Sequence, residues 1–283
     1  MQKYAVFTMD VEAFTDTECV SASSHKVSLD VLDGFDEYLK ILDKYNIKST
    51  LFTVGNFAPQ MAKRLENAIA SGHRLALHGQ HHTPPLNIPP DTFRAEIAEA
   101  KERLTKLFRT EVSGFRAPCF SMDNARLNIL KELGFKYDSS NIGFEKARHT
   151  TALDLTAYED HGNGIFSDKG FFEFSIAKQK IFGIPFPISG GGYMRLADWN
   201  FMKFHIKQYL QRNNYYVFYL HPFELTSQKI PILKDLKAYD KYYLTAGIRS
   251  FGKHIEQLIC MLQAFGFQFI TFEELHEKLS ANA

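Results

Sequence analysis

This sequence contains few cysteines and a single tryptophan, its net charge is close to zero, and it has no long apolar run. The three cysteines (Cys19, Cys119 and Cys260) are far apart and no Cys-x-x-Cys pair occurs, which argues against a disulfide framework and a thiolate zinc site. No run of about 18 apolar residues occurs, so no transmembrane helix is predicted. A net charge of +1 gives no electrostatic reason to expect nucleic acid or an anionic membrane as a partner. The N-terminal residues resemble no signal peptide, so we expect a cytoplasmic protein.

Apolar side chains, in contrast, are plentiful. The chain of 283 residues is 45% hydrophobic and has 26 Phe and 13 Tyr, which suffices for a sizeable core. No composition break, Pro/Ser linker or internal repeat is present. Residues 1–283 are therefore predicted to form one domain.

Strand and helix patterns alternate along most of the chain. Strands are predicted at 4–9, 48–55, 73–77, 111–115, 135–138, 171–174, 181–184, 215–220 and 267–271, and helices at 30–45, 57–71, 90–108, 124–133, 198–212, 248–266 and 272–279. Residues 141–195 break the alternation and are interpreted as an enlarged loop region on the substrate side. Residues 224–247 are interpreted as a long, solvated loop. Repeated strand–helix units predict an α/β fold with parallel strands.

Histidines are concentrated in the segment 77–85, at the end of the third predicted strand. His78 and His82 are four residues apart and can face the same side of a turn, with His81 pointing away between them. Imidazole is the commonest side-chain ligand of catalytic divalent metals, but such a site usually takes three protein ligands. Taken alone, the segment is equally well interpreted as a solvated, His-rich loop.

Polar side chains also stand at the ends of other predicted strands. The full set is Asp10, Glu12, His78, His82, Arg116 and His221. Each has an ordinary structural explanation, such as a helix cap or a surface ion pair. Because the carboxyl ends of parallel strands meet at one edge of a sheet, their joint occurrence predicts a functional site there.

Four motifs resemble, in order and spacing, those of the polysaccharide deacetylases (carbohydrate esterase family 4). They are Thr8-Met-Asp10-Val-Glu12, His78-x-x-x-His82, Phe115-Arg116-Ala-Pro118 and Leu220-His221-Pro222. Asp-x-Glu in the first motif and the segments 114–122 and 190–196 resemble one branch of that family. The resemblance covers residues 4–224. It implies a distorted (β/α) barrel of about seven parallel strands that hydrolyses N-acetyl groups on amino sugars with one divalent metal ion.

The resemblance assigns a role to each polar residue of the first two motifs. His78 and His82 would be metal ligands, Asp10 the general base and Glu12 the carboxylate ligand. Glu12 departs from the family, because many members have adjacent aspartates and the second one binds the metal. Asp16, or exchanged roles for Asp10 and Glu12, are the alternatives.

The remaining motifs supply the expected acid and its supports. Arg116 would keep Asp10 ionised, since a nearby cation lowers the pKa of a carboxylate. His221 is the expected general acid that protonates the leaving amine. Family members orient this histidine with a carboxylate from a fourth motif. Asp138 is the first candidate here and Asp198 the second, although the usual Asp-x-x-Asp-Trp pattern does not follow Asp138.

The substrate side is expected to include Pro118, Cys119, Tyr193 and Leu220. The backbone N–H of Cys119, or that of its neighbour, is the candidate oxyanion donor. A Cys-Phe pair stands where the family has a glycine after the proline. The triple glycine 190–192 is no phosphate-binding loop, because no Gly-Lys-Ser/Thr follows. It either lets the backbone approach a substrate or forms a tight turn.

The sequence therefore predicts a metal-dependent N-deacetylase acting on an N-acetylated sugar in a polysaccharide or glycan precursor. A nucleotide- or lipid-linked intermediate of polysaccharide biosynthesis is the expected substrate, given the predicted cytoplasmic location. Zn²⁺ suits a His/His/carboxylate site, with Co²⁺, Ni²⁺, Fe²⁺ and Mn²⁺ as alternatives. Two other functions stay open: an amidase acting on a small non-sugar amide, and a carbohydrate-binding protein without catalytic activity.

Overall fold

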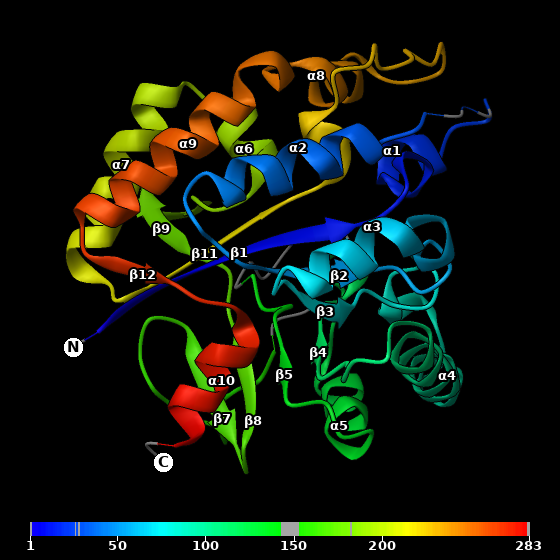
Figure 1. The fold of residues 1–283 in the computed structure, drawn as a ribbon, viewed down its shortest axis with the longest axis vertical. Coiled ribbons are helices and arrows are strands. Elements are labelled where there is room, and N and C mark those ends of the chain that lie inside the picture. The colour runs from blue at the N-terminus through cyan, green and yellow to red at the C-terminus, as the bar shows by residue number, and fades with distance from the viewer. Residues whose placement is uncertain (1, 26, 28, 143–152, 182, 282–283) are drawn as a thin grey trace.

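The computed structural model describes residues 2–281 apart from 26, 28, 143–152 and 182, and is organised around a curled, mainly parallel sheet (Figure 1). Its strands are β1 (Lys3–Val11), β2 (Ser49–Thr53), β3 (Arg74–Leu77), β4 (Gly114–Phe115), β5 (Tyr137–Asp138), β6 (Glu159–Asp160), β7 (Ile165–Asp168), β8 (Phe171–Phe174), β11 (Tyr215–Leu220) and β12 (Phe267–Phe269). The spatial order is β11-β1-β2-β3-β4-β5-β8-β7-β6, and β12 pairs with β1. The seven strands from β11 to β8 run parallel. The predicted α/β barrel of parallel strands is thus confirmed, in the form of a half-barrel.

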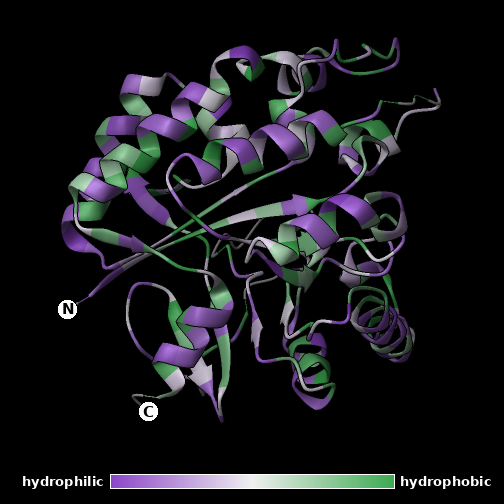
Figure 2. Cartoon of the chain, in the orientation of Figure 1, coloured by the Kyte–Doolittle hydropathy of each residue, from purple (hydrophilic) through white to green (hydrophobic). Residues whose placement is uncertain are grey.

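Helices pack around the curled sheet. They are α1 (Glu18–Ser21), α2 (Leu32–Asp43), α3 (Ala58–Ala70), α4 (Pro90–Phe108), α5 (Asn124–Glu132), α6 (Gly191–Leu196), α7 (Trp199–Arg212), α8 (Ala238–Thr245), α9 (Ile248–Ala264) and α10 (Phe272–Ser280). Figure 1 shows α2, α7 and α9 along one side of the sheet and α3, α4 and α5 along another. Hydrophilic and hydrophobic residues alternate around these helices, as expected for helices with one face on a core (Figure 2).

Two apolar cores lie on the two faces of the sheet. Side chains alternate between the faces along a strand. Ala5, Phe7 and Met9 of β1 therefore lie in the core under the helices, and Val6 lies in the core inside the barrel. Asp10 is on the same face as Val6, at the carboxyl end of β1. The opposite end of the barrel is closed by α10, whose Phe272 packs in the inner core.

Some predicted elements differ from those in the structure. The strand expected at 181–184 is replaced by an antiparallel pair, β9 (Lys178–Ile181) and β10 (Ile184–Pro187). The expected loop at 224–247 contains α8. Within the enlarged region 141–195, residues 143–152 lie outside the described part, and the rest includes β6 to β10 and α6. Among the described residues, no helix has the length and apolar character needed to cross a bilayer.

Candidate functional site

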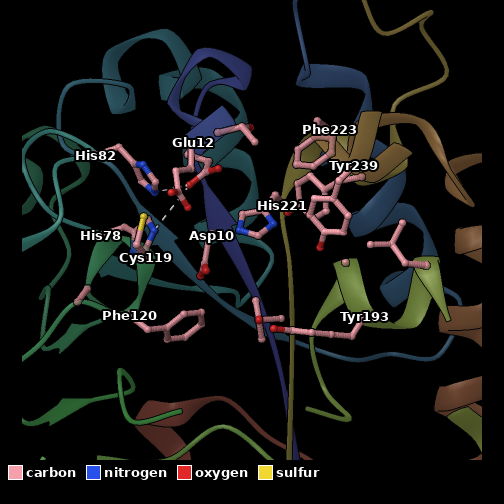
Figure 3. A pocket seen from close by; sticks show the side chains of 17 residues that line it. Asp10, Glu12, His78, His82, Cys119, Phe120, Tyr193, His221, Phe223 and Tyr239 are labelled. Atoms are coloured by element: carbon pink, nitrogen blue, oxygen red, sulfur yellow. Dashed lines mark ion pairs between the residues drawn. The ribbon is translucent and has the colours of Figure 1, made fainter. Parts of the chain in front are cut away.

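The predicted functional residues converge at the carboxyl ends of β1, β3 and β11, beside the turn that follows β4. A pocket of about 320 Å³ opens there, and its lining includes Asp10, Glu12, His78, His82 and His221. Figure 3 shows these five side chains pointing toward one another around the pocket. The convergence expected from the strand ends is therefore present in the structure.

Glu12, His78 and His82 form a compact cluster at the end of the pocket. The Oε2 atom of Glu12 lies 2.7 Å from Nε2 of His82 and 3.8 Å from Nε2 of His78 (Figure 3). One donor atom from each residue lies within 4.8 Å of the other two. His81 points away and contacts Asn56 through Nδ1 at 2.6 Å. Three ligand atoms converging in this way, from the buried Glu12 and His78 and the partly buried His82, form a possible metal site.

The two histidines reach this cluster because the chain turns sharply after β3. Gly79 has a left-handed backbone with φ of 77°. A Cβ at this position would lie 2.9 Å from the carbonyl oxygen of His81 and 3.1 Å from Cγ of Pro118. Only glycine combines that conformation with the available space. Gly79 is thus the residue that allows His78 and His82 to face the same carboxylate.

Two members of the cluster, His78 and Glu12, have the protonation states that a divalent metal requires. Burial opposes protonation of His82, but the adjacent Glu12 carboxylate raises its pKa, so a metal ion there would displace a proton from that ring. His78 Nδ1 lies 2.8 Å from the carbonyl oxygen of Arg116, so Nδ1 carries the proton and Nε2 keeps its lone pair. Burial lowers the pKa of His78 to about 4, which keeps the ring neutral. Burial opposes ionisation of Glu12, but the neighbouring His82 and His221 lower its pKa to about 2. Oε2 of Glu12 is buried and lies beside Nε2 of both His78 and His82. This donor set fits a metal ion such as Zn²⁺.

Asp10 is placed differently from Glu12, because it is paired with a buried arginine. Its Oδ1 accepts a hydrogen bond from Nη1 of Arg116 at 2.7 Å. The same guanidinium donates to Thr8 Oγ1 at 2.9 Å and to the carbonyl and hydroxyl oxygens of Ser139, both at 3.1 Å. It also packs 4.2 Å from the ring centre of Phe52. Arg116 is fully buried, so Asp10 is held firmly at the edge of the pocket.

Asp16, the alternative ligand, lies outside the cluster of Glu12, His78 and His82. Its Oδ2 accepts a hydrogen bond from the backbone N–H of Ala13 at 3.1 Å, within a short 3-10 helix that follows β1. The structure therefore favours Glu12 over Asp16 as the carboxylate of the possible metal site.

His221 has a buried carboxylate partner, but it is Glu224. Oε2 of Glu224 accepts the backbone N–H of His221 at 3.0 Å and lies 3.2 Å from its Nδ1. The other oxygen of Glu224 accepts a hydrogen bond from Nε of Arg195 at 3.1 Å. Burial opposes protonation of His221, yet Glu12 and Glu224 raise its pKa to about 9. These carboxylates thus favour the protonated ring, the state in which it can donate a proton.

Both aspartates predicted as partners of His221 lie elsewhere, and this expectation is corrected. Asp138 accepts hydrogen bonds from the hydroxyl and backbone N–H of Ser140 at 2.8 and 3.1 Å. Burial raises its pKa to about 6, and burial with the adjacent Asp138 raises the pKa of Glu173 well above its usual value. Asp198 caps α7 by accepting the backbone N–H of Phe201. A strand end predicts the edge of the sheet at which a side chain lies, but not its partner.

Two of the four predicted substrate-side residues line the pocket, Cys119 and Tyr193. Cys119 and the following Phe120 both have left-handed backbones, with φ of 54° and 55°. Such strain in non-glycine residues clusters at functional sites. Phe120 donates its backbone N–H to Ala117, whereas the N–H of Cys119 has no acceptor within the described residues. That N–H is therefore available to a ligand.

The other two, Pro118 and Leu220, do not line the pocket, which corrects the prediction. Leu220 lies on the helix-facing side of β11 and packs in the outer core. Its neighbour Tyr219 faces the barrel interior and lines the pocket instead. Pro118 is buried and packs against Gly79. The alternation of side chains along β11 was the signal that could have identified Tyr219.

Residues that the sequence did not indicate complete the walls. Tyr239 and Tyr243 come from α8, and Thr17 and Glu18 come from the segment after β1. The two tyrosines are four residues apart and so share one face of the helix. This spacing could have marked them, but the segment 224–247 lacked an overall helical period.

A curled parallel half-barrel with a carboxylate and two histidines at its carboxyl edge is the architecture expected of the carbohydrate esterases of family 4. Residues 30–137 match the family model of the polysaccharide deacetylases, and residues 149–276 match that of a domain of unknown function, DUF3473. The predicted resemblance to the polysaccharide deacetylases is thereby confirmed.

Individual proteins show the same resemblance. A peptidoglycan deacetylase of Helicobacter pylori is 25% identical over 107 residues, which are 38% of this chain and 36% of that protein. The chain thus matches only about a third of the length of this relative. A Mycobacterium smegmatis protein assigned to the polysaccharide deacetylases has a similar fold, with a TM-score of 0.60, 18% identity and coverage of 99% of this chain and 91% of the other.

Solved structures of the same fold differ in activity. One is an allantoinase, with a TM-score of 0.60, 14% identity and coverage of 98% of this chain and 90% of the other. Another is a family 4 pseudoenzyme of Bacillus anthracis, with a TM-score of 0.54, 11% identity and coverage of 97% and 66%. At such identities the likeness concerns the fold alone, so the activity must be argued from the site.

Proposed function

We propose that this protein is a metal-dependent hydrolase that removes N-acetyl groups from amino sugars of a glycan. The observation that carries the proposal is the buried carboxylate of Glu12, which faces the ring nitrogens of His78 and His82 in a pocket that also contains Asp10 and His221. A binding protein needs no such buried cluster of ionisable groups, because charged groups are costly to bury.

Glu12, His78 and His82 would hold the metal ion, for which Zn²⁺ is the first choice and Co²⁺, Ni²⁺, Fe²⁺ and Mn²⁺ are alternatives. A divalent ion held there would make a bound water more acidic and would polarise the amide carbonyl. Asp10 then accepts the proton of the attacking water. Its bond to Arg116 fixes one carboxylate oxygen and leaves the other for that proton.

The leaving amine must be protonated, because an amide anion is a very poor leaving group. His221 lines the same pocket, and because its neighbouring carboxylates favour the protonated ring it can donate that proton. The backbone N–H of Cys119, which has no acceptor within the described residues, would stabilise the negative charge that develops on the carbonyl oxygen. One pocket thus contains a candidate for each of the base, the acid and the oxyanion donor.

The shape of the site favours a substrate longer than one sugar. A second cavity, of about 660 Å³, shares Thr17, Glu18, Tyr239 and Tyr243 with the first. Cavities of about 300–1,000 Å³ are typical of ligand sites. Tyr239 is 69% exposed and offers an aromatic face at the junction of the two cavities. We therefore expect the second cavity to hold the sugar beside the one that is deacetylated.

The charge of these walls argues against a nucleotide-linked substrate. Within the described part of the chain, the first pocket is lined by no lysine or arginine. The second is lined by Glu18, Asp235 and Asp240 but by a single cation, Lys237. A diphosphate would meet repulsion there, whereas an uncharged oligosaccharide would not. A neutral N-acetylated oligosaccharide is therefore the substrate class that fits best.

The test is release of acetate from N-acetylglucosamine monomers and oligomers and from the uridine diphosphate sugar, with metal content measured alongside. We expect oligomers to be the best substrates. His78→Ala should lose the metal and lower kcat/KM by at least about 100-fold, since loss of supporting groups alone costs 10–100-fold. His81→Ala is the matched control, because this histidine lies in the same turn but faces Asn56. It should keep both metal and activity.

Several outcomes would overturn the proposal. Full activity of His78→Ala, or activity of the parent protein without metal, would exclude the mechanism. Turnover of cyclic amides or ureides alone would identify a non-sugar amidase. Sugar binding with no turnover at any metal loading would identify a catalytically inactive carbohydrate-binding protein.

A further inference from the structure

We propose that Glu224 and Arg195 are positioning residues that hold His221 in the orientation from which it protonates the leaving amine. The inference rests on the proposed function, because it concerns the acid of that reaction. It assigns a role to the triple-glycine segment before Arg195, which the proposed chemistry does not otherwise use.

Glu224 fixes His221 through two different groups. One carboxylate oxygen accepts the backbone N–H of His221 at 3.0 Å and lies 3.2 Å from Nδ1 of its ring. The ring therefore cannot turn without losing the second contact. With Nδ1–H directed to Glu224, the other ring nitrogen, Nε2, is left for the pocket. The carboxylate thus determines which nitrogen can meet a substrate.

Arg195 fixes Glu224 in turn. Its Nε donates to the second carboxylate oxygen at 3.1 Å, and the side chains of both residues are fully buried. The guanidinium also donates to the carbonyl oxygen of Ala246 and lies between the rings of Phe223 and Tyr243, at 5.6 and 5.4 Å. A buried carboxylate needs such a partner, because an unpaired buried charge is strongly destabilising. Arg195 therefore keeps Glu224 ionised and immobile.

The glycines before Arg195 make room for this arrangement. A Cβ at Gly191 would lie 2.3 Å from Oε2 of Glu224, the oxygen that contacts His221. A Cβ at Gly190 would lie 2.6 Å from the hydroxyl of Tyr219. Gly191 and Arg195 both belong to α6, so one short helix supplies both the space for the carboxylate and its cation. Close packing against Tyr219 and Glu224 thus explains Gly190 and Gly191, whereas Gly192 lines the pocket, where its backbone can approach a substrate.

The pocket is thus flanked by two buried arginine–carboxylate pairs with different tasks. In the Arg116–Asp10 pair the carboxylate itself reaches the pocket and can accept a proton. In the Arg195–Glu224 pair the carboxylate is fully buried and acts through His221. Removing the first should therefore impair every substrate, whereas removing the second should impair only substrates whose leaving group needs a proton.

The experiment compares an amide with an activated ester. Wild type, Glu224→Gln, Arg195→Lys and Asp10→Asn are assayed on an N-acetylglucosamine oligomer and on 4-nitrophenyl acetate, whose nitrophenolate leaves without protonation. Metal content and thermal unfolding are measured for each variant. Glu224→Gln keeps the shape of the side chain and removes its charge. Arg195→Lys keeps the positive charge and removes the several N–H donors of the guanidinium.

We expect Glu224→Gln to lower kcat on the amide by about 100-fold with little change in KM, the lower range for loss of acid–base catalysis. Activity on the ester should stay within about threefold of wild type, and metal content should be unchanged. Arg195→Lys should show the same pattern in weaker form. Asp10→Asn should lose both activities. Equal losses on amide and ester in Glu224→Gln, or no loss on the amide, would overturn the inference.

A second measurement needs no turnover. Long-range ¹H–¹⁵N correlation of the histidine rings should show the Nδ1 proton of His221, assigned by its absence in His221→Asn, and its signal should shift in Glu224→Gln. An unchanged signal would overturn the positioning role even if the amide were no substrate. Failure of wild type to cleave any N-acetylated sugar, with the expected shift present, would instead refute the proposed function alone.

Discussion

Removing the cation of the Arg116–Asp10 pair should cost far more stability than removing the cation of an exposed pair of the same length. Arg116→Met deletes a fully buried guanidinium that donates to Asp10, Thr8 and Ser139, and it leaves Asp10, itself 2% exposed, without a counterion. Arg64 is the matched control. It contacts Asp36 at 2.9 Å, but the two side chains are 37% and 52% exposed.

The difference in burial sets the expected magnitudes. Breaking a buried pair by removing one partner costs about 3–5 kcal/mol, because the remaining charge stays buried and unpaired. An exposed pair contributes about 0–1 kcal/mol. Arg116→Met should therefore lose about 4 kcal/mol and Arg64→Met less than about 1 kcal/mol. Adding Asp10→Asn to Arg116→Met should restore part of the loss, with a coupling energy of about 2 kcal/mol, since residues in direct contact are not additive.

The assay is urea unfolding of metal-free protein, followed by far-ultraviolet circular dichroism. Chelation before the measurement removes the contribution of metal binding to stability, because a ligand that binds only the folded state raises its apparent stability. Equal m-values across the variants would establish that the same surface is exposed on unfolding. The reasoning is refuted if Arg116→Met costs no more than Arg64→Met, or if the double variant shows additive losses.

Two further outcomes concern pH and substrate length. Burial lowers the pKa of His73 from 6.5 to about 4, so the neutral ring contributes its full stability above about pH 6.5 and loses about 3 kcal/mol of it as the pH falls toward 4. Urea unfolding of wild type and His73→Ala across this pH range should show the difference in unfolding free energy between the two proteins shrinking as the pH falls. Tyr239→Ala should lower kcat/KM on oligosaccharides by about tenfold, which corresponds to the loss of about one stacking contact. Tyr242→Ala is the control, because Tyr242 is on the same helix but outside both cavities, and it should leave kcat/KM unchanged. Equal effects of the two substitutions would contradict the second cavity as a sugar site.

The edge at which the site forms could be predicted because strand periodicity is a local property of the sequence. The apolar run of β1 ends at Asp10, and those of β3 and β11 end at His78 and His221. Parallel strands bring these ends together whatever the details of packing. The side chains that Arg116 contacts could be predicted from the sequence only in part. Asp10 was expected as its partner, but Ser139 becomes visible only once β5 is placed next to β4.

The carboxylate that contacts His221 could not be predicted from the ends of the strands. Asp138 and Asp198 were chosen by analogy with a motif that the sequence does not contain. Glu224 lies three residues after His221, on a short 3-10 helix that brings its carboxylate back to the histidine backbone. The sequence does carry a signal for this, because an acidic residue at that spacing is the pattern of a capping box. What it does not carry is the position of Arg195, which depends on how α6 packs against β11.

The spacing of Asp10 and Glu12 gains a physical reason from β1. Side chains two residues apart on a strand share one face, so Asp10 and Glu12 can both reach the pocket while Val11 between them packs in the core under the helices. An adjacent pair of aspartates would have to use the irregular end of a strand to bring both carboxylates to one side. A carboxylate at i+2 starts about 6–7 Å further along the strand, and the extra methylene of glutamate lets it reach His82 at 2.7 Å. The departure from adjacent aspartates is therefore a different solution to the same geometric problem, in which the base and the proposed metal ligand are separated along the strand.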